Sequence, residues 1–308
     1  MTSPPYFDEK QIDELCDMAT VTDWLEQAWH DLGNGTADTT VRVRANAGGL
    51  LASAMAASWP RHNIAGGKLY LTHANGFEFL VALFSPDKGL LATFDGRGLT
   101  ATRTAAGTAL AIRHLKPPDA HVAALIGTGT QSKPHVLALA QELEITDLRI
   151  SGRSVDKVEE LVVWANEQGV AARATTVDEA VEGAKVIATV TASYTPLFDG
   201  DLLDPAAMVC GVGSTKAERR ELDRATVERA SFVVTDEPRA APTEAGDLVH
   251  AVADGVFDWD DLVDLKDVVS GTVTPPPAGS GIVLFESQGV ALQDVVIATL
   301  VHQRSLEG

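Results

Sequence analysis

The apolar positions of the chain follow different periods in successive regions. Between residues 6 and 33 they recur at helical spacing, which predicts two helices. Between residues 38 and 95 apolar and polar residues alternate, which predicts a mostly antiparallel, strand-rich region. A further helix is expected to begin at a Thr100 cap and to run to about residue 115. The first third of the chain therefore predicts a mixed α+β domain.

From residue 120 onward, short apolar runs alternate with helical patterns. Strands that read as continuous apolar runs are buried on both faces, which is typical of a parallel sheet covered by helices. The pattern predicts an α/β fold, a Rossmann-type doubly wound parallel sheet. Its strands are expected at residues 121–126, 147–151, 170–174, 185–190, 207–212 and 231–235. A strand at 282–285 and a C-terminal helix follow, and the stiff segment Lys116-Pro117-Pro118-Asp119 marks the clearest domain boundary.

A glycine-rich turn follows the first strand of this region. The strand leads into Gly127-Thr128-Gly129-Thr130-Gln131, and a helix comes next. Two glycines allow a tight turn and a close backbone approach, and the amide groups at a helix N-terminus bind phosphate. Ser132 stands at the position of the usual third glycine. The context predicts a dinucleotide site; the alternative is a plain buried turn.

The end of the second strand indicates which dinucleotide binds. A carboxylate there accepts a hydrogen bond from the ribose 2′-hydroxyl of NAD, whereas an arginine accommodates the 2′-phosphate of NADP. Here the strand runs into Gly152-Arg153-Ser154, and no carboxylate occurs before Asp156. We therefore expect NADPH, with NADH the weaker alternative, although Arg153 could also be a solvated surface side chain.

Charge and composition narrow the partners. The 308 residues carry 24 Lys and Arg against 43 Asp and Glu, a formal net charge of −19, which disfavours nucleic acid and anionic membranes as partners. No apolar run has the length of a membrane span, and no signal peptide is visible, so we expect a cytoplasmic protein. Cys16 and Cys210 are expected to be buried thiols, and no metal ligands are assigned.

Three cations in the first domain stand out against this acidic background. Arg44 and Lys68 lie on expected strands, and Arg103 lies in the helix after Thr100. Each alone could be a surface charge. Together they suggest a clamp for a substrate carboxylate, with Lys68 as proton donor because partial burial shifts the pKa of a lysine. His73 is a second candidate acid, or else a structural histidine.

These segments resemble the ornithine cyclodeaminase/mu-crystallin family over nearly the whole chain. The resemblance implies a homodimer built through the strand-rich domain, to which the C-terminal helix returns. It therefore implies a substrate-binding and dimerisation domain of residues 1–116 plus 283–308 and a dinucleotide-binding domain of residues 117–282. Its carriers include Ala54-Met55-Ala56, Gly67-Lys68, Arg103-Thr104-Ala105-Ala106, Gly127-Thr128-Gly129-Thr130-Gln131, Thr189-Val190-Thr191, Gly211-Val212-Gly213-Ser214, Arg220-Glu221-Leu222-Asp223, Gly246-Asp247-Leu248 and Phe285-x-Ser287-x-Gly289-x-Ala291-x-x-Asp294.

The resemblance also implies roles for individual residues. Arg44, Lys68 and Arg103 would hold the substrate carboxylate near the nicotinamide and carry the catalysis. We also expect Met55, Phe77, Phe79 and Thr215 in the substrate site, where Phe77 and Phe79 are bulkier than the residues of many family members. The cofactor would contact Thr104, Gly127, Thr128, Gly129, Thr130, Gln131, Gly152, Arg153, Ser154, Thr191, Gly213, Ser214 and Gly289.

One departure from the family pattern indicates the reaction. Cyclodeaminases of the family have a catalytic aspartate where this chain has Thr215. Cyclodeamination needs a base at that point, whereas reduction of an existing C=N bond does not. Gly213-Ser214-Thr215-Lys216 is similar to the ketimine reductase branch, which uses NADPH. We expect an NADPH-dependent reductase of small, linear or cyclic α-imino acids. The alternatives are an amino-acid dehydrogenase, cyclodeaminase-type ammonia release, and a non-catalytic binder of NADPH and hydrophobic ligands.

Overall fold

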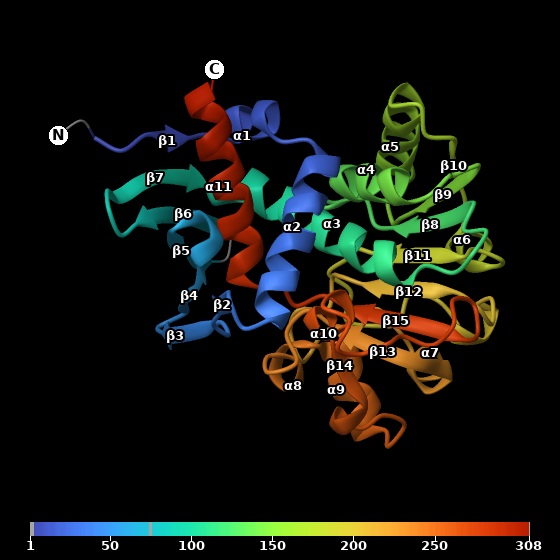
Figure 1. Ribbon diagram of the computed structural model, residues 1–308. Coiled ribbons are helices and arrows are strands. Elements are labelled where there is room, and N and C mark those ends of the chain that lie inside the picture. The colour runs from blue at the N-terminus through green and yellow to red at the C-terminus, as the bar shows by residue number, and fades with distance from the viewer. Residues whose placement is uncertain (1–2, 74–75, 308) are drawn as a thin grey trace. The chain divides into compact units, whose positions relative to one another are not determined.

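The structure is a computed structural model that describes residues 3–73 and 76–307 (Figure 1). The described residues fall into two compact units. Unit 1 comprises Met1–Ala106 and Gly289–Gly308, and unit 2 comprises Gly107–Gln288. Among the residues that the structure describes, no helix combines the length and the apolar character needed to cross a membrane.

Unit 1 contains a seven-stranded sheet in which neighbouring strands are antiparallel, except that β1 runs parallel to β7. The order is β1-β7-β6-β5-β4-β2, with β3 also paired to β4. This confirms the strand-rich region expected from alternating polarity. The strands are β1 (Tyr6–Phe7), β2 (Asp38–Thr39), β3 (Val43–Ala47), β4 (Leu50–Trp59), β5 (Ile64–His73), β6 (Gly76–Ser85) and β7 (Gly89–Asp95).

One face of this sheet packs against the C-terminal helix, α11 (Ala291–Glu307), which contacts β4, β5 and β6. Figure 1 shows α11 in red beside the blue and teal strands. The other helical elements of the unit are α1 (Glu9–Leu15), α2 (Met18–Gly33) and the short 3₁₀ turn η1 (Pro60–His62). Asp8 and Asp17 cap α1 and α2 at their N-termini, so the first helix begins after residue 6, and Tyr6–Phe7 is a strand.

The helix α3 (Gly96–Leu115) begins one turn earlier than the sequence suggested. Thr100 lies inside it and donates its hydroxyl to the Gly96 carbonyl, so it is not the cap. A serine or threonine inside a helix can donate its hydroxyl to the carbonyl of the preceding turn, and one at the N-terminus can cap the helix. The sequence pattern does not distinguish these two positions, so the predicted cap was wrong. The division between the two units falls inside α3, between Ala106 and Gly107. The boundary therefore comes before the Lys116-Pro117 segment, where we expected it.

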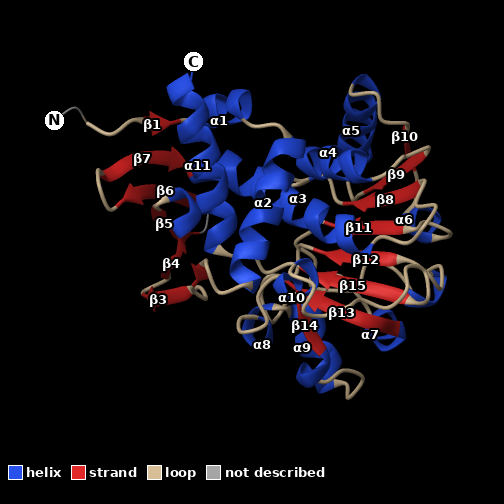
Figure 2. Ribbon diagram, in the orientation of Figure 1, coloured by secondary structure: helices blue, strands red, loops and turns tan. Residues whose placement is uncertain are grey.

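Unit 2 contains an eight-stranded, wholly parallel sheet with the order β10-β9-β8-β11-β12-β15-β13-β14. This confirms the Rossmann-type fold, whose strands alternate with helices (Figure 2). The strands are β8 (Val122–Ile126), β9 (Asp147–Ser151), β10 (Ala172–Ala174), β11 (Val186–Thr189), β12 (Met208–Gly211), β13 (Ala230–Thr235), β14 (Leu262–Asp264) and β15 (Ile282–Glu286).

The connecting helices of unit 2 are short, and several begin at an acidic or hydroxyl cap. Thr176 and Asp223, for example, cap α6 and α7. The helical elements are α4 (Ser132–Glu142), α5 (Val155–Glu167), α6 (Val177–Val181), η2 (Gly200–Leu202), α7 (Arg224–Arg229), α8 (Ala241–Glu244), α9 (Gly246–Ala253), η3 (Trp259–Asp261) and α10 (Leu265–Val269).

The β15 strand differs from the expected domain division. We expected residues 283–308 in the strand-rich domain, but β15 pairs with β12 and β13 within the parallel sheet of unit 2. A five-residue apolar strand carries no signal for which sheet it joins, because either sheet can bury it. The assignment of functions to whole domains stays a prediction.

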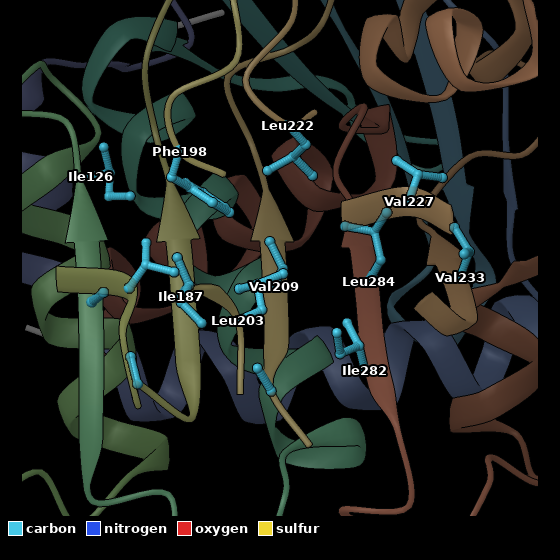
Figure 3. Packing of buried hydrophobic residues seen from close by; sticks show 14 of the residues in the cluster. Ile126, Ile187, Phe198, Leu203, Val209, Leu222, Val227, Val233, Ile282 and Leu284 are labelled. Atoms are coloured by element: carbon cyan, nitrogen blue, oxygen red, sulfur yellow. The ribbon is translucent and has the colours of Figure 1, made fainter. Parts of the chain in front are cut away.

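A buried apolar cluster holds one face of the parallel sheet together (Figure 3). It draws Ile126, Ile187, Val209 and Leu284 from four neighbouring strands. Leu222 packs into it from the segment before α7. Burying such side chains contributes about 1.5–3 kcal/mol each, before entropy is subtracted. The cluster therefore supports the strand ends from which functional loops emerge.

The strand order reverses between β8 and β11. From β8 the chain moves outward to β9 and β10, and it then returns to place β11 on the other side of β8. In open α/β sheets, ligands bind beyond the carboxyl ends of the strands at such a reversal. The Val190 amide donates to the Ile126 carbonyl at 2.9 Å, which holds the two strand ends together at this point.

Candidate functional site

Lys68 is a buried cation on β5 of unit 1. Its side chain is 1% exposed, and its ammonium lies 3.2 Å from Asp294 Oδ1 and donates to the Thr100 hydroxyl. Burial lowers the pKa of Lys68 to about 7, and the nearby charges of Arg103 and Arg42 lower it as well, while Asp294 opposes the shift. Lys68 can therefore give up or take a proton near neutral pH.

Arg103 on α3 converges on the same carboxylate. Its Nε lies 3.5 Å from Asp294 Oδ1, and its Nη1 donates to Gln293 Oε1 at 2.7 Å. Its side chain is 7% exposed. Of the three predicted catalytic cations, the structure thus brings Lys68 and Arg103 together.

Gly289 lies against the Arg103 guanidinium. Its φ is +75°, and a Cβ there would lie 2.2 Å from Arg103 Nη1. Any other residue would collide with the guanidinium and would also strain the backbone. We predicted Gly289 as a cofactor contact, and this arrangement gives it a further reason to be glycine.

Arg44 differs from the other two cations in its exposure. It lies on β3 opposite Ser53, on the same sheet face as Met55 and Lys68, but its side chain is exposed. Arg42, two positions earlier, instead reaches the Gly289 carbonyl at 3.4 Å. Both arginines belong to one alternating run, so polarity alone did not distinguish them. The role of Arg44 stays a prediction.

Asp294 and Gln293 are the site residues that we did not assign. Both lie in the first turn of α11 and are fully buried. Asp294 Oδ1 serves Lys68 and Arg103, and Oδ2 has no hydrogen-bond partner in the described part of the chain. The sequence feature that could have identified Asp294 is an acidic residue in a mostly apolar C-terminal helix, because a buried carboxylate needs a cation as its partner.

An aromatic group borders Lys68. Phe79 lies with its ring centroid 4.6 Å from the ammonium, stacked on Phe77 and tilted against Tyr70. Met55 lies directly opposite Lys68 on β4 and is buried, whereas Phe77 is 43% exposed. Aromatic faces attract cations, so this group stabilises the ammonium while leaving an apolar surface beside it. The predicted substrate residues Met55, Phe77 and Phe79 therefore lie near Lys68.

The glycine turn of unit 2 fits a pyrophosphate. A Cβ at Gly127, whose φ is +126°, would lie 2.9 Å from the Val190 carbonyl oxygen, while one at Gly129 would meet nothing within 4 Å. No side chain caps α4. Among its first three residues, Ser132 donates its amide to the Gly129 carbonyl at 3.0 Å and Pro134 has no N–H, so the Lys133 amide is the one that can face an anion. Gln131 Oε1 is buried without a hydrogen-bond partner among the described residues. Thr128 and Thr130 lie in the same turn, and Thr130 is exposed.

The loop after β9 lies beside this turn. A Cβ at Gly152 would lie 3.0 Å from Thr128 Cγ2, so the two loops pack closely. Arg153 and Ser154 are exposed, and Ser154 begins α5 without bonding it through its side chain. Both polar side chains can therefore turn toward a phosphate.

The carboxyl ends of β11 and β12 lead to Thr191 and Gly213. The Glu221 carboxylate accepts both of their amide hydrogens, at 2.6 and 2.7 Å. Thr215 follows two residues later, half-buried. In the sheet order, β11 and β12 follow β8, whose end leads into the glycine turn. The three loops are therefore neighbours at this edge of the sheet, which is the arrangement that the predicted cofactor contacts require.

Two predicted cofactor contacts have structural partners of their own. Ser214 is 1% exposed, donates to the Arg219 carbonyl and accepts from the Asp247 amide, both at 3.2 Å. Its hydroxyl therefore faces the protein interior, and its role as a cofactor contact stays a prediction. Thr104 donates to the Thr100 carbonyl one helical turn earlier. The sequence does not show in which direction a hydroxyl side chain beside a motif residue points.

Comparisons with known proteins agree with this architecture. Residues 7–308 match the model of the ornithine cyclodeaminase/mu-crystallin family. Ketimine reductase mu-crystallin from Rattus norvegicus is 35% identical over 223 residues, which are 72% of this chain and 68% of the relative. The iminosuccinate reductase of Paracoccus denitrificans is 32% identical over 222 residues, 72% of this chain and 68% of the relative. The structure of the latter in complex with NAD+ has a TM-score of 0.90 and covers 99% of this chain and 97% of its own, at 26% identity in the structural alignment.

A third relative is similar over nearly the whole length of the chain. The structure of a probable ornithine cyclodeaminase from Bordetella pertussis Tohama I has a TM-score of 0.92 and 34% identity. It covers 99% of this chain and 98% of its own.

The surroundings of Lys68 predict an abnormal titration. In ¹³C NMR spectra of the lysine Cε carbons, we expect the Lys68 signal to titrate near 7, well below the ordinary lysine pKa of about 10.4. Lys68→Met assigns the signal. Asp294→Asn removes the negative charge that favours the ammonium, so the midpoint should fall further. A Lys68 midpoint near the ordinary lysine pKa of about 10.4 would contradict this description of the site.

Proposed function

The chain belongs to the ornithine cyclodeaminase/mu-crystallin family, and from that premise we propose that it is an NADPH-dependent reductase of small α-imino acids. It is an oxidoreductase that acts on C=N bonds, as its relatives named for ketimine and iminosuccinate reduction are. The observation that carries the proposal is the buried group of Lys68 and Arg103 in unit 1. Two cations next to an apolar, aromatic surface suit a small molecule that carries a carboxylate.

Arg103 is suited to bind the substrate carboxylate. A guanidinium offers paired N–H donors that match the two oxygens of a carboxylate. In the structure Arg103 Nη1 donates to Gln293, and the guanidinium forms an ion pair with Asp294, so both residues hold the side chain in place from α11. An arginine that is oriented in advance loses less entropy when the substrate binds.

Lys68 is suited to supply the proton. Bound nicotinamide would provide the hydride that reaches the imine carbon, and the nitrogen then needs one proton to become an amine. A group whose pKa lies near neutral pH transfers a proton most effectively there. Asp294, 3.2 Å away, would stabilise the ammonium until the transfer. Thr215, where cyclodeaminases have an aspartate, offers no base for ammonia release.

The direct test is NADPH oxidation with a panel of imines, made by mixing 2-oxo acids with ammonia or methylamine and supplemented with cyclic ketimines. We expect turnover with at least one class. Arg103→Ala should lower activity by roughly 100-fold, because a charge-assisted bond to the carboxylate is lost. NADPH affinity should stay near that of the wild type.

Arg97→Ala is the matched control, since Arg97 lies on the same helix and is exposed. It should retain activity. Tight NADPH binding without turnover of any imine would contradict the reductase and favour a binding protein, whereas ammonia release from ornithine would favour a cyclodeaminase.

NADPH preference rests on Arg153. The relative from Paracoccus denitrificans binds NAD+, so NADH is the alternative cofactor. Arg153→Asp should weaken NADPH binding by about 10–100-fold and leave NADH binding equal or stronger, because a carboxylate repels the 2′-phosphate. Lys157→Asp, an equal charge change at an exposed position nearby, should leave the preference unaltered. The measurement is nicotinamide fluorescence titration, and an unaltered preference in Arg153→Asp would refute the assignment.

We also propose that the chain forms a homodimer through the sheet of unit 1. Leu69 follows Lys68 on β5 and so points to the opposite face. That face carries Leu69 and Leu80 as a cross-strand pair, 55% and 43% exposed. Val43, Leu50 and Phe84 add to it, each at least 45% exposed. A contiguous apolar sheet face of this kind is typical of a protein–protein interface.

Sedimentation equilibrium tests the dimer. The wild type should have twice the 32.5 kDa chain mass. Leu69→Glu should weaken association by at least about tenfold, because it buries an unpaired charge. Val163→Glu, at an exposed position on α5, is the control and should leave the dimer intact. A wild-type monomer at micromolar concentration would contradict the interface.

A further inference from the structure

Three carboxyl groups lie together inside unit 2, where the proposed mechanism uses none of them. They are Glu221 before α7, Asp247 in the first turn of α9, and Glu286 at the end of β15, and each is 0% exposed. Their neighbours Leu222 and Leu284 belong to the apolar cluster of Figure 3. We call these three residues the carboxyl cluster.

Glu221 joins the ends of two central strands. One carboxylate accepts from the Thr191 amide at 2.6 Å, the Gly213 amide at 2.7 Å and the Thr189 hydroxyl at 3.0 Å. The loops are so close that a Cβ at Gly213 would lie 1.8 Å from the Thr191 carbonyl oxygen. Three hydrogen bonds to one side chain therefore set the spacing between the β11 and β12 loops.

Asp247 holds Glu221 in turn. Its Oδ1 accepts from the amides of Glu221 and Leu222, both at 2.7 Å. These bonds position the backbone from which the Glu221 side chain extends. No N–H or hydroxyl group among the described residues donates to its other oxygen, Oδ2.

Glu286 completes the cluster without a donor of its own. No N–H or hydroxyl group in the described part of the chain bonds to either of its oxygens, and Oε1 lies 2.5 Å from where a Gly211 Cβ would be. None of the three acids forms an ion pair with a described Lys, Arg or His. Among the residues that the structure describes, no group of three or more Asp, Glu, His or Cys side chains is arranged to hold a metal ion. Three adjacent buried negative charges without a counterion would cost too much, so the cluster must keep a proton.

The neighbouring acids show where that proton lies. Burial raises the pKa of Glu286 well above its ordinary value, and the charges of Asp247, Glu221 and Asp236 and a hydrogen bond with Asp247 raise it further. Burial also raises the pKa of Asp247 to about 7, although its backbone donors oppose this. Asp236, whose charge acts on Glu286, lies nearby, and so does the Cys210 thiol, whose pKa is raised by burial and by Glu286. Near neutral pH, one proton is therefore shared between Glu286 and Asp247.

We propose that the carboxyl cluster is a proton-holding support that positions the Thr191 and Gly213 loops for the nicotinamide end of the cofactor. This role rests on the cofactor site proposed above. Glu221 is the positioning residue, since it contacts both loops. Glu286 holds a proton, which reduces the negative charge of the cluster and therefore the free-energy cost of burying it.

The support should fail at alkaline pH. Both acids have their pKa values raised in the folded protein, so the folded state binds more protons than the unfolded state above the ordinary carboxyl pKa of about 4. Stability therefore falls as the pH rises from about 4 toward the folded values, of which that of Asp247 is about 7 and that of Glu286 lies well above its ordinary value. If the shared proton is lost, the negative charges of Glu286 and Asp247 repel each other, which would disturb the backbone that carries Glu221.

The experiment measures dinucleotide affinity by fluorescence titration from about pH 6 to about pH 9, together with thermal unfolding over the same range. Wild-type affinity for NADPH should fall by about tenfold over the range. Glu286→Gln cannot ionise, and its amide can still donate to Asp247, so both the affinity and the unfolding temperature should fall less steeply with pH than in the wild type. Glu228→Gln, exposed on α7, is the control and should follow the wild type.

A second variant separates positioning from general stability. In Glu221→Gln, one of the three donors loses its acceptor, and NADPH affinity should fall by at least about tenfold at every pH. Binding of 2′-phospho-ADP-ribose, which lacks the nicotinamide, should stay near that of the wild type, because Thr191 and Gly213 lie away from the adenine side. An equal loss for both ligands would overturn the positioning role.

The outcomes distinguish this inference from the proposed function. Dinucleotide binding with the same pH dependence in Glu286→Gln as in the wild type would overturn the role of the cluster alone. Binding of neither NADPH nor NADH to the wild type would contradict the proposed cofactor site and, with it, the positioning role.

Discussion

The ion group of Lys68, Arg103 and Asp294 is the constraint on which unit 1 depends. Each of these side chains is almost completely buried, and removing one partner of such a group costs about 3–5 kcal/mol because it leaves a charge without a counterion. The group joins β5, α3 and α11. The C-terminal helix is therefore held to the sheet by a charged contact as well as by apolar packing.

The same contact prepares the chemistry. Asp294 allows two cations to lie close together in an apolar setting, and Phe79 adds an aromatic face to one of them. The result is a lysine whose pKa is near neutral and an arginine whose donors are already oriented. Stability and proposed activity thus rest on the same few residues, which is common where charges are buried for function.

Unit 2 buries charge in a different way. Its carboxyl cluster has no cation among the described residues and relies on backbone amides and a retained proton. Backbone donors suit this place because the carboxyl ends of parallel strands leave amide groups to be satisfied. Where unit 1 uses opposite charges to orient side chains, unit 2 uses acids to orient loops.

The sequence by itself determined the local structure and the residue types at the site. The period of the apolar residues gave both sheets, and the glycine turn and the cations Lys68 and Arg103 stood out as chemistry. These features depend on neighbours a few residues away, which a pattern can represent.

Only the tertiary structure decided how distant residues pair. Lys68 and Asp294 lie 226 positions apart, and β15 joins its sheet between β12 and β13. It also decided that Arg42 reaches Gly289 and that Ser214 faces inward. Glu221, Asp247 and Glu286 meet only when three separate segments fold together. Whether an acid is a solvated surface group or a buried one depends on what lies beside it, and that is a property of the fold.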